Sequence, residues 1–228
     1  MTAVAIDGPA GAGKSTVARA VASRLGYSYL DTGALYRAVA LAAIERGIDP
    51  EDGRALADVT TELDVALSEG IVTLDGKDVT ERVRDPDVTQ IVSTVSAHPL
   101  VRRALLERQR ALAATGDVVM EGRDIGSTVL PDADVKIYLT ASPDERALRR
   151  AEQEGLATDE ASLAVLKESI AERDEADATR DVSPLIRASG AELLDTSDLS
   201  IDEVVDRIVE AVQRAEAGSA SESQGVER

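Results

Sequence analysis

The stretch "AVAIDGPAGAGKSTVARAVASRL", residues 3–25, contains the pattern G-x-x-x-x-G-K-S between Gly8 and Ser15. A short apolar run precedes the glycines, as in a buried parallel strand, and small or apolar residues recur at helical spacing after Lys14. In such a strand–loop–helix, backbone amides turn toward one anion and the helix N-terminus adds partial positive charge. Lys14 would reach the terminal phosphates, and the Ser15 hydroxyl would bind Mg²⁺. The stretch predicts a nucleoside triphosphate site; a glycine-rich turn that only caps a helix is the alternative.

The composition indicates one large domain with an aliphatic core. The chain has 228 residues, 43% of them hydrophobic, and it lacks Phe, Trp and Cys. The lack of cysteine excludes disulfides and thiolate metal sites, and a formal net charge of -18 argues against a broad nucleic-acid-binding surface. No run approaches the ~20 apolar residues of a membrane span, and no basic and apolar leader marks export. We therefore expect a cytoplasmic monomer without a membrane or nucleic-acid partner.

Strand-like and helix-like segments alternate along most of the chain, which predicts an α/β fold with a doubly wound parallel sheet and helices on both faces. The expected strands are 3–6, a short strand ending near 31, 117–122, 134–141 and 191–197. One expected helix follows Lys14, and a second follows a turn at 32–33. Further helices are expected at 51–62, 87–114, 142–154, 159–180 and 200–215, and the helical region 87–114 should break at 98–99. Hairpin signals between short β-type runs in 63–83 predict a small antiparallel insert.

Arginines cluster late in the chain, and in an acidic protein such local gatherings of cations are informative. Arg146, Arg149 and Arg150 fall on one side of a predicted helix, where a solvated face paired with nearby glutamates is the alternative. Arg173 and Arg180 continue an apolar helical stripe together with an aspartate. Because unpaired charges are costly to bury, these two arginines predict either a polar cleft or a helix end that projects into water.

Another set of charges follows the strand expected at 117–122. Arg123 and Asp124 would lie at the carboxyl edge of the sheet, where open α/β sheets bind ligands. Glu121 occupies the position at which many P-loop proteins carry an acid that helps to hold Mg²⁺. A plain turn is the alternative here. The single histidine, His98, lies beside a proline at a helix break, and we expect it to be structural.

Four blocks of sequence together resemble the bacterial cytidylate kinase family: "IDGPAGAGKST", "YLDTGALYR", "GRDIG" with "PDADVKIYLTAS", and "ERDEADATRDVSPL". The resemblance runs from about residue 3 to about 212. It implies a P-loop nucleoside monophosphate kinase that transfers the γ-phosphate of ATP, with Mg²⁺, to CMP or dCMP in pyrimidine nucleotide metabolism. It also implies a single domain, 1–217, with a monophosphate-binding insert at about 37–110 and a helical lid at about 146–182. The polar residues 218–228 are expected to be a disordered tail.

The resemblance also implies the residues of the site. The ATP-binding residues would be Gly8, Pro9, Ala10, Gly11, Ala12, Gly13, Lys14, Ser15, Thr16 and Arg149. The CMP-binding residues would be Thr32, Arg37, Ser93, Arg102, Arg123, Asp124, Arg173, Asp177 and Arg180. Of these, Ser93, Arg102 and Asp124 would contact the base, and Arg173 and Asp177 the sugar. Lys14, Arg123 and Arg180 would be catalytic, and the metal ligand would be Ser15, with Thr16 as the alternative.

Three other functions fit a P-loop. A kinase for another small phosphorylated acceptor, such as UMP or AMP, would share the chemistry. A nucleotide-hydrolysing switch would need a guanine-reading element such as N-K-x-D, and the sequence has none. A non-catalytic nucleotide sensor would leave Lys14 and the acceptor-side arginines without a purpose.

Overall fold

A computed structural model describes residues 1–68 and 70–225 of the chain, with side chains described up to residue 218. The strands are β1 Ala3–Asp7, β2 Ser28–Asp31, β3 Val65–Ser68, β4 Ile71–Leu74, β5 Lys77–Asp78, β6 Val118–Gly122, β7 Val135–Thr140 and β8 Glu192–Asp195. The α-helices are α1 Lys14–Leu25, α2 Thr32–Arg46, α3 Gly53–Glu62, α4 Pro86–Ala97, α5 Pro99–Ala113, α6 Pro143–Glu154, α7 Glu160–Thr179 and α8 Ile201–Gly225. Two short helical turns, η1 Arg82–Arg84 and η2 Ile125–Val129, complete the described elements.

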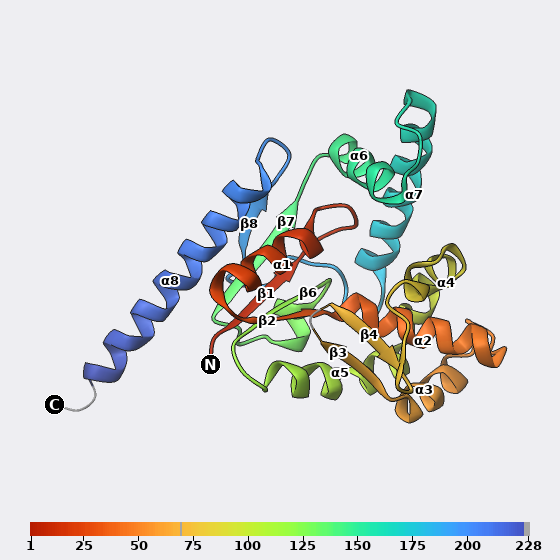
Figure 1. Cartoon of the computed structure of the whole chain (residues 1–228), viewed down its shortest axis with the longest axis horizontal. Helices are drawn as coiled ribbons and strands as arrows, with labels where there is room; N and C mark the ends of the chain where they lie inside the picture. The colour runs from red at the N-terminus through yellow and green to blue at the C-terminus, as the bar shows by residue number, and fades with distance from the viewer. Residues whose placement is uncertain (69, 226–228) are drawn as a thin grey trace.

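A five-stranded parallel sheet forms the centre of the molecule, in the order β2-β6-β1-β7-β8 (Figure 1). Side chains alternate across the sheet, as the two-residue period of a strand requires. Val4 and Ile6 of β1 pack with α1 and α8 on one face, while Ala5 packs with Ile125 and Val129 of η2 on the other. The predicted doubly wound α/β fold is confirmed.

The P-loop crosses the carboxyl end of the sheet so closely that one of its residues has no room for a side chain. Gly8 directly follows β1, and a Cβ built on it would lie 2.1 Å from the carbonyl oxygen of Leu139 in β7. The backbone then turns through Gly13, whose φ is 84°, into the first residue of α1. The loop amides are thus held against the neighbouring strand, ahead of the N-terminus of a 12-residue helix.

The segment of chain between β2 and β6 forms a second hydrophobic cluster. It contains buried residues of α2, α3, α4 and α5, together with side chains of the antiparallel sheet β3-β4-β5. The predicted antiparallel insert is therefore present, and Figure 1 shows it beside α2 and α3, on the far side of the sheet from α8. Helices α6 and α7 pack on each other and stand above the carboxyl end of the sheet (Figure 1).

The structure corrects two local expectations. Thr32 and Gly33 do not form a turn but begin α2, because the Asp31 carboxylate accepts a hydrogen bond from the Ala34 amide and caps the helix. Helix α8 continues to Gly225, so residues 218–225 are helical rather than a disordered tail; no proline interrupts this segment, and Ala, Ser and Glu are compatible with a helix. Residues 226–228 of the expected tail lie outside the described part of the chain.

Other expectations hold. The helical region 87–114 is divided at His98, whose Nε2 lies 2.8 Å from the Pro50 carbonyl, so this histidine has the structural place expected for it. Helix α7 ends at Thr179, which leaves Arg180 as the first residue beyond it. No helix among the described residues is long and apolar enough to cross a bilayer.

The packing of Gly8 yields a stability prediction. Gly8→Ala should lower the free energy of unfolding by about 2 kcal/mol or more, because the added methyl forces either the P-loop or β7 to move. Gly26→Ala is the matched control: its φ is 73°, but nothing lies within 4 Å of the added carbon, so only the left-handed strain of about 1 kcal/mol applies. Urea unfolding measures both values, and equal losses would contradict the steric argument.

Candidate active site

A cavity of about 810 Å³ lies where the P-loop, the carboxyl ends of β2 and β6, and helices α2, α6 and α7 meet. Most of the predicted site residues line it: Ala10, Gly11, Ala12, Gly13, Lys14, Ser15, Thr16, Thr32, Arg37, Arg102, Arg123, Asp124, Arg149, Arg173, Asp177 and Arg180. The structure therefore brings together side chains that are up to 170 positions apart in the chain, as Ala10 and Arg180 are. The cavity lies within the size range of small-molecule sites.

Three predicted residues lie outside this lining. Gly8 packs against Leu139 of β7. The carbonyl oxygen of Pro9 accepts a hydrogen bond from Lys14, but Pro9 does not line the cavity. Ser93 is on α4, but the residues of that helix which face the cavity are Val92 and Ser96, one turn apart. The contact predicted for Ser93 thus stays a prediction, and Ser96 is a polar residue that the sequence patterns missed.

Lys14 is the central cation of the donor end. Its side chain is only 7% exposed, and its Nζ donates a hydrogen bond of 2.7 Å to the Pro9 carbonyl. Burial, followed by the positive charge of Arg123, lowers the pKa of Lys14 to about 7. Since an ammonium in this position lacks a full counter-charge, an arriving phosphate would supply the missing one.

Oxygen ligands suited to Mg²⁺ lie beside Lys14. The buried Glu121 carboxylate accepts a hydrogen bond of 2.7 Å from the Tyr29 hydroxyl, and the neighbouring Ser15 side chain favours its charged form. Burial raises the pKa of Glu121, and the negative charge of Asp31 acts in the same direction. A hydroxyl and two carboxylates fit a hard cation, which would relieve this repulsion. Among the described residues no group of three or more His, Cys, Asp or Glu could hold a metal ion, so phosphate and water oxygens would complete its coordination.

At the other end of the cavity, a buried ion pair presents a fixed pattern of donors and acceptors. Nη2 of Arg102 lies 2.7 Å from Oδ2 of Asp124, and both side chains are at most 6% exposed. Nη1 of the same arginine donates to the Ser96 carbonyl at 3.0 Å, and its guanidinium carbon lies 5.1 Å from the centre of the Tyr36 ring. The ion pair, the hydrogen bond to Ser96 and the contact with the Tyr36 ring therefore fix the orientation of this guanidinium.

Between the two ends lie four guanidinium groups, those of Arg37, Arg123, Arg173 and Arg180, and the Asp177 carboxylate pairs with two of them. Asp177 accepts from Nε of Arg123 at 2.9 Å and from Nη1 of Arg180 at 3.2 Å. Burial, followed by the nearby charge of Arg123, lowers the pKa of Arg173 to about 10. Burial also lowers the pKa of Arg37, followed by the charge of Arg150. The excess of buried positive charge suits a site for phosphates.

Some of these guanidinium nitrogens have no partner within the described chain. Nε of Arg173 and Nη2 of Arg180 are buried and make no hydrogen bond. Arg37, in contrast, donates from Nη1 to the hydroxyl of Thr89 at 2.8 Å and to the Val83 carbonyl at 3.2 Å. Buried donors without acceptors are costly, so the free nitrogens indicate where an anionic ligand would bind.

The cluster on α6 divides between two roles that the sequence could not separate. Arg149 lines the cavity and donates to Glu145 and to the Thr196 hydroxyl and carbonyl, at 2.8–2.9 Å. Arg150 also lines it and pairs with Glu154. Arg146 does not line the cavity; it pairs with Asp174, whose carboxylate also accepts from the Ala10 amide. One side of the helix therefore serves two purposes: Arg149 and Arg150 line the cavity, while Arg146 fastens the helix to the P-loop through Asp174.

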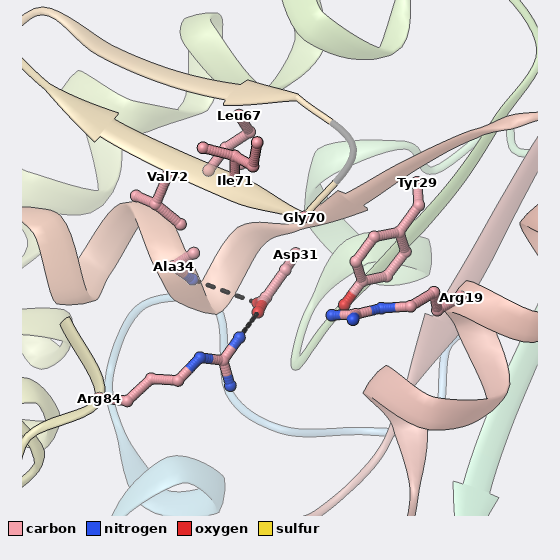
Figure 2. Close-up of a pocket in the computed structure, with 9 residues that line it drawn as sticks. All are labelled: Arg19, Tyr29, Asp31, Ala34, Leu67, Gly70, Ile71, Val72 and Arg84. Atoms are coloured by element: carbon pink, nitrogen blue, oxygen red, sulfur yellow. Dashed lines mark hydrogen bonds and ion pairs between the residues drawn. The ribbon is translucent and has the colours of Figure 1, made fainter. Parts of the chain in front are cut away.

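Sequence patterns missed further charged residues at this site. Arg84 of η1 lines the cavity and lies 3.8 Å from Asp31, which itself caps α2 (Figure 2). Figure 2 also shows Arg19 lying against the ring of Tyr29, beside the hairpin of β3 and β4. These residues line a separate hollow of about 10 Å³. That hollow has room for about one water and not for a nucleotide. The capping position of Asp31 could have been predicted, whereas nothing in the sequence around Arg84 indicates the site.

Comparisons with known proteins agree with this geometry. The family model described as cytidylate kinase matches residues 4–214. The chain belongs to the cytidylate kinase family. A protein named cytidylate kinase from Pelotomaculum thermopropionicum is 51% identical over 217 residues, covering 92% of this chain and 95% of its own. Another of that name from Symbiobacterium thermophilum is 50% identical over 216 residues, covering 92% and 96%.

A solved structure shares the fold alone. The crystal structure of an uncharacterized protein from Eubacterium ventriosum has a TM-score of 0.52 with 13% sequence identity, and the match covers 93% of this chain and 99% of that one. The resemblance stated from the sequence blocks is confirmed by the family model. As a cytidylate kinase family member, the chain is an ATP-dependent nucleoside monophosphate kinase.

Lys14→Met should remove most of the activity while the protein remains folded. We expect kcat to fall by about 10³-fold or more, because the loss concerns charge at the transferred phosphate. The variant should be at least as stable as the wild type near pH 7, since the unfolded chain binds a proton at Lys14 that the folded chain resists.

The pH dependence of the stability difference between the Lys14 variant and the wild type gives a second readout. Because the pKa of Lys14 is lower in the folded protein, the wild type gains stability as the pH rises from about 7 toward 10.5, so the advantage of the variant should shrink over that interval. Circular dichroism during urea unfolding at several pH values measures it. Unfolding of the variant at neutral pH would contradict a purely chemical role for Lys14.

Proposed function

We propose that the protein transfers the γ-phosphate of ATP to CMP or dCMP, giving CDP or dCDP, in pyrimidine nucleotide metabolism. The observation that carries the acceptor assignment is the buried Arg102–Asp124 pair at the end of a cavity whose other end is a P-loop. Membership of the cytidylate kinase family supports the same conclusion. We further propose that the protein acts in the cytoplasm as a monomer, with Mg²⁺ bound together with ATP.

The pair matches the edge of cytosine. Cytosine carries an amino donor at position 4, next to a ring nitrogen and a carbonyl that accept. Asp124 can accept from the amino group while Arg102 donates to the two acceptors. Uracil places a carbonyl oxygen where cytosine has its amino group, so Asp124 would face another acceptor. A site built around such hydrogen bonds rejects the mismatched base because its buried polar groups would be left unpaired.

The sugar and phosphate of the acceptor would lie toward the arginines. Arg173 and Asp177 would bind the sugar hydroxyls, and Arg37, Arg123 and Arg180 would hold the monophosphate. Asp177 orients two of these arginines already, which limits the reorganisation needed when the anion arrives.

At the donor end, the P-loop amides and Lys14 would hold the β- and γ-phosphates, and Arg149 would contact the nucleotide from α6. The hydroxyl of Ser15, with Thr16 as the alternative, would hold Mg²⁺, which neutralises phosphate charge during transfer. The acceptor phosphate is itself the nucleophile, so the site needs no strong general base. Closure of α6 and α7 would exclude water and so favour transfer over hydrolysis.

An acceptor panel tests the proposal directly. Formation of ADP from ATP and Mg²⁺ should be fast with CMP or dCMP and at least about tenfold slower with UMP, AMP, GMP or no acceptor. Turnover confined to another monophosphate would keep the chemistry and reject the base contacts, while ADP formed equally without an acceptor would reject the kinase. Removing Mg²⁺ with a chelator should abolish turnover, and restoring it should recover the rate.

The base contact has a test of its own. Asp124→Asn replaces a carboxylate oxygen with an amide group that can donate to the carbonyl of uracil, so the preference for CMP over UMP should fall by about tenfold or more. Asp181→Asn, which neutralises an exposed aspartate, is the control and should leave the preference unchanged. An unaltered preference in the Asp124 variant would show that the pair does not read the base.

A further inference from the structure

The buried carboxylate of Asp7 is a charged group that the proposed reaction does not use. It is the last residue of β1, only 3% exposed, and it is not part of the cavity lining. Its Oδ1 accepts the Ile125 amide at 2.7 Å, and its Oδ2 accepts the Gly126 amide at 2.8 Å. Both acceptor atoms of one side chain therefore bind successive amides of the loop that follows β6.

That loop is fastened to β1 at both ends. Where it begins, Gly122 of β6 is paired with Asp7 in the parallel sheet. Where it ends, the carboxylate of the same residue holds Ile125 and Gly126, the first residues of η2. Arg123 and Asp124 are the only residues between the two attachments. One faces the proposed acceptor phosphate and the other the proposed base.

We propose that Asp7 is a positioning residue for the monophosphate acceptor, which acts by holding the loop of Arg123 and Asp124 against the strand that leads into the P-loop. The inference rests on the proposed function, because it takes the roles of those two side chains from it. Anchoring of the loop by Asp7 would also keep Asp124 in place for its 2.7 Å ion pair with Arg102.

The two amides need two acceptor oxygens, which a carboxylate at this position supplies. Burial raises the pKa of Asp7 to about 6, although the hydrogen bonds from Gly126 and Ile125 oppose that rise. Asparagine would offer one acceptor and would turn an amino group toward the second amide, leaving a buried donor unpaired.

Asp7→Asn tests the proposal through the two substrates separately. We expect KM for CMP to rise by about tenfold, while KM for ATP changes by less than about twofold, because the loop that moves belongs to the acceptor end. Asp134→Asn is the matched control. Its carboxylate accepts the Ala3 amide at 2.7 Å, at the opposite end of the same strand, and both KM values should stay unchanged.

A role in stability alone would give a different result. In that case Asp7→Asn would lower the melting temperature while the KM values for CMP and ATP stayed equal to those of the wild type or rose together, and either outcome would overturn the proposal. Asp7→Glu keeps two acceptors but displaces them by one methylene, so we expect a smaller rise in KM for CMP than in the asparagine variant.

Hydrogen exchange on the wild type supplies evidence that needs no folded variant. The amides of Ile125 and Gly126 should exchange as slowly as those of β1, and exchange at the rate of exposed loops would overturn the proposal. This measurement is independent of the acceptor. A wild type without activity toward CMP but with both amides protected would reject the proposed function and leave the anchoring of the loop standing.

Discussion

Repulsion among buried cations is the constraint on which the site depends. Lys14, Arg123, Arg173 and Arg180 converge on one cavity, and in the part of the chain that the structure describes only Asp177 forms ion pairs with two of them. Burial lowers the pKa of Lys14 and of Arg173, which shows that the charged forms are held against a desolvation cost. Anions bound in the cavity would neutralise this repulsion, and the phosphates of two nucleotides would supply them. Phosphates bound there would offset part of this desolvation cost.

The parallel sheet makes this convergence possible. The P-loop after β1 and the loop after β6 leave the same edge of the sheet because β1 and β6 are adjacent and parallel. Asp7 joins the end of β1 to the loop after β6, while Asp174 joins the P-loop to α6. Carboxylates thus fasten the backbone around the site, and arginines face into it. The whole chain has a net charge of -18, so the arginines that line the cavity are a local exception to an acidic composition.

The sequence by itself determined the elements whose signals are local. The glycine spacing and Lys14 predicted the P-loop, the strand–helix alternation predicted the doubly wound sheet, and the hairpin signals predicted the antiparallel insert. The block "GRDIG" placed Arg123 and Asp124 at the sheet edge, since it follows a strand. Strand and helix periodicity depend on neighbouring residues and can be read from one chain.

Only the tertiary structure decided which charged residues serve the site. Arg146, Arg149 and Arg150 share one helical face, yet Arg146 pairs with Asp174, 28 positions away, and does not line the cavity. The partners of Asp7 lie more than 110 positions from it, and Arg84 reaches the site from η1. Hydrogen bonds and ion pairs join atoms across space, and which partners meet depends on how the sheet and helices pack. No periodicity in the sequence carries that information.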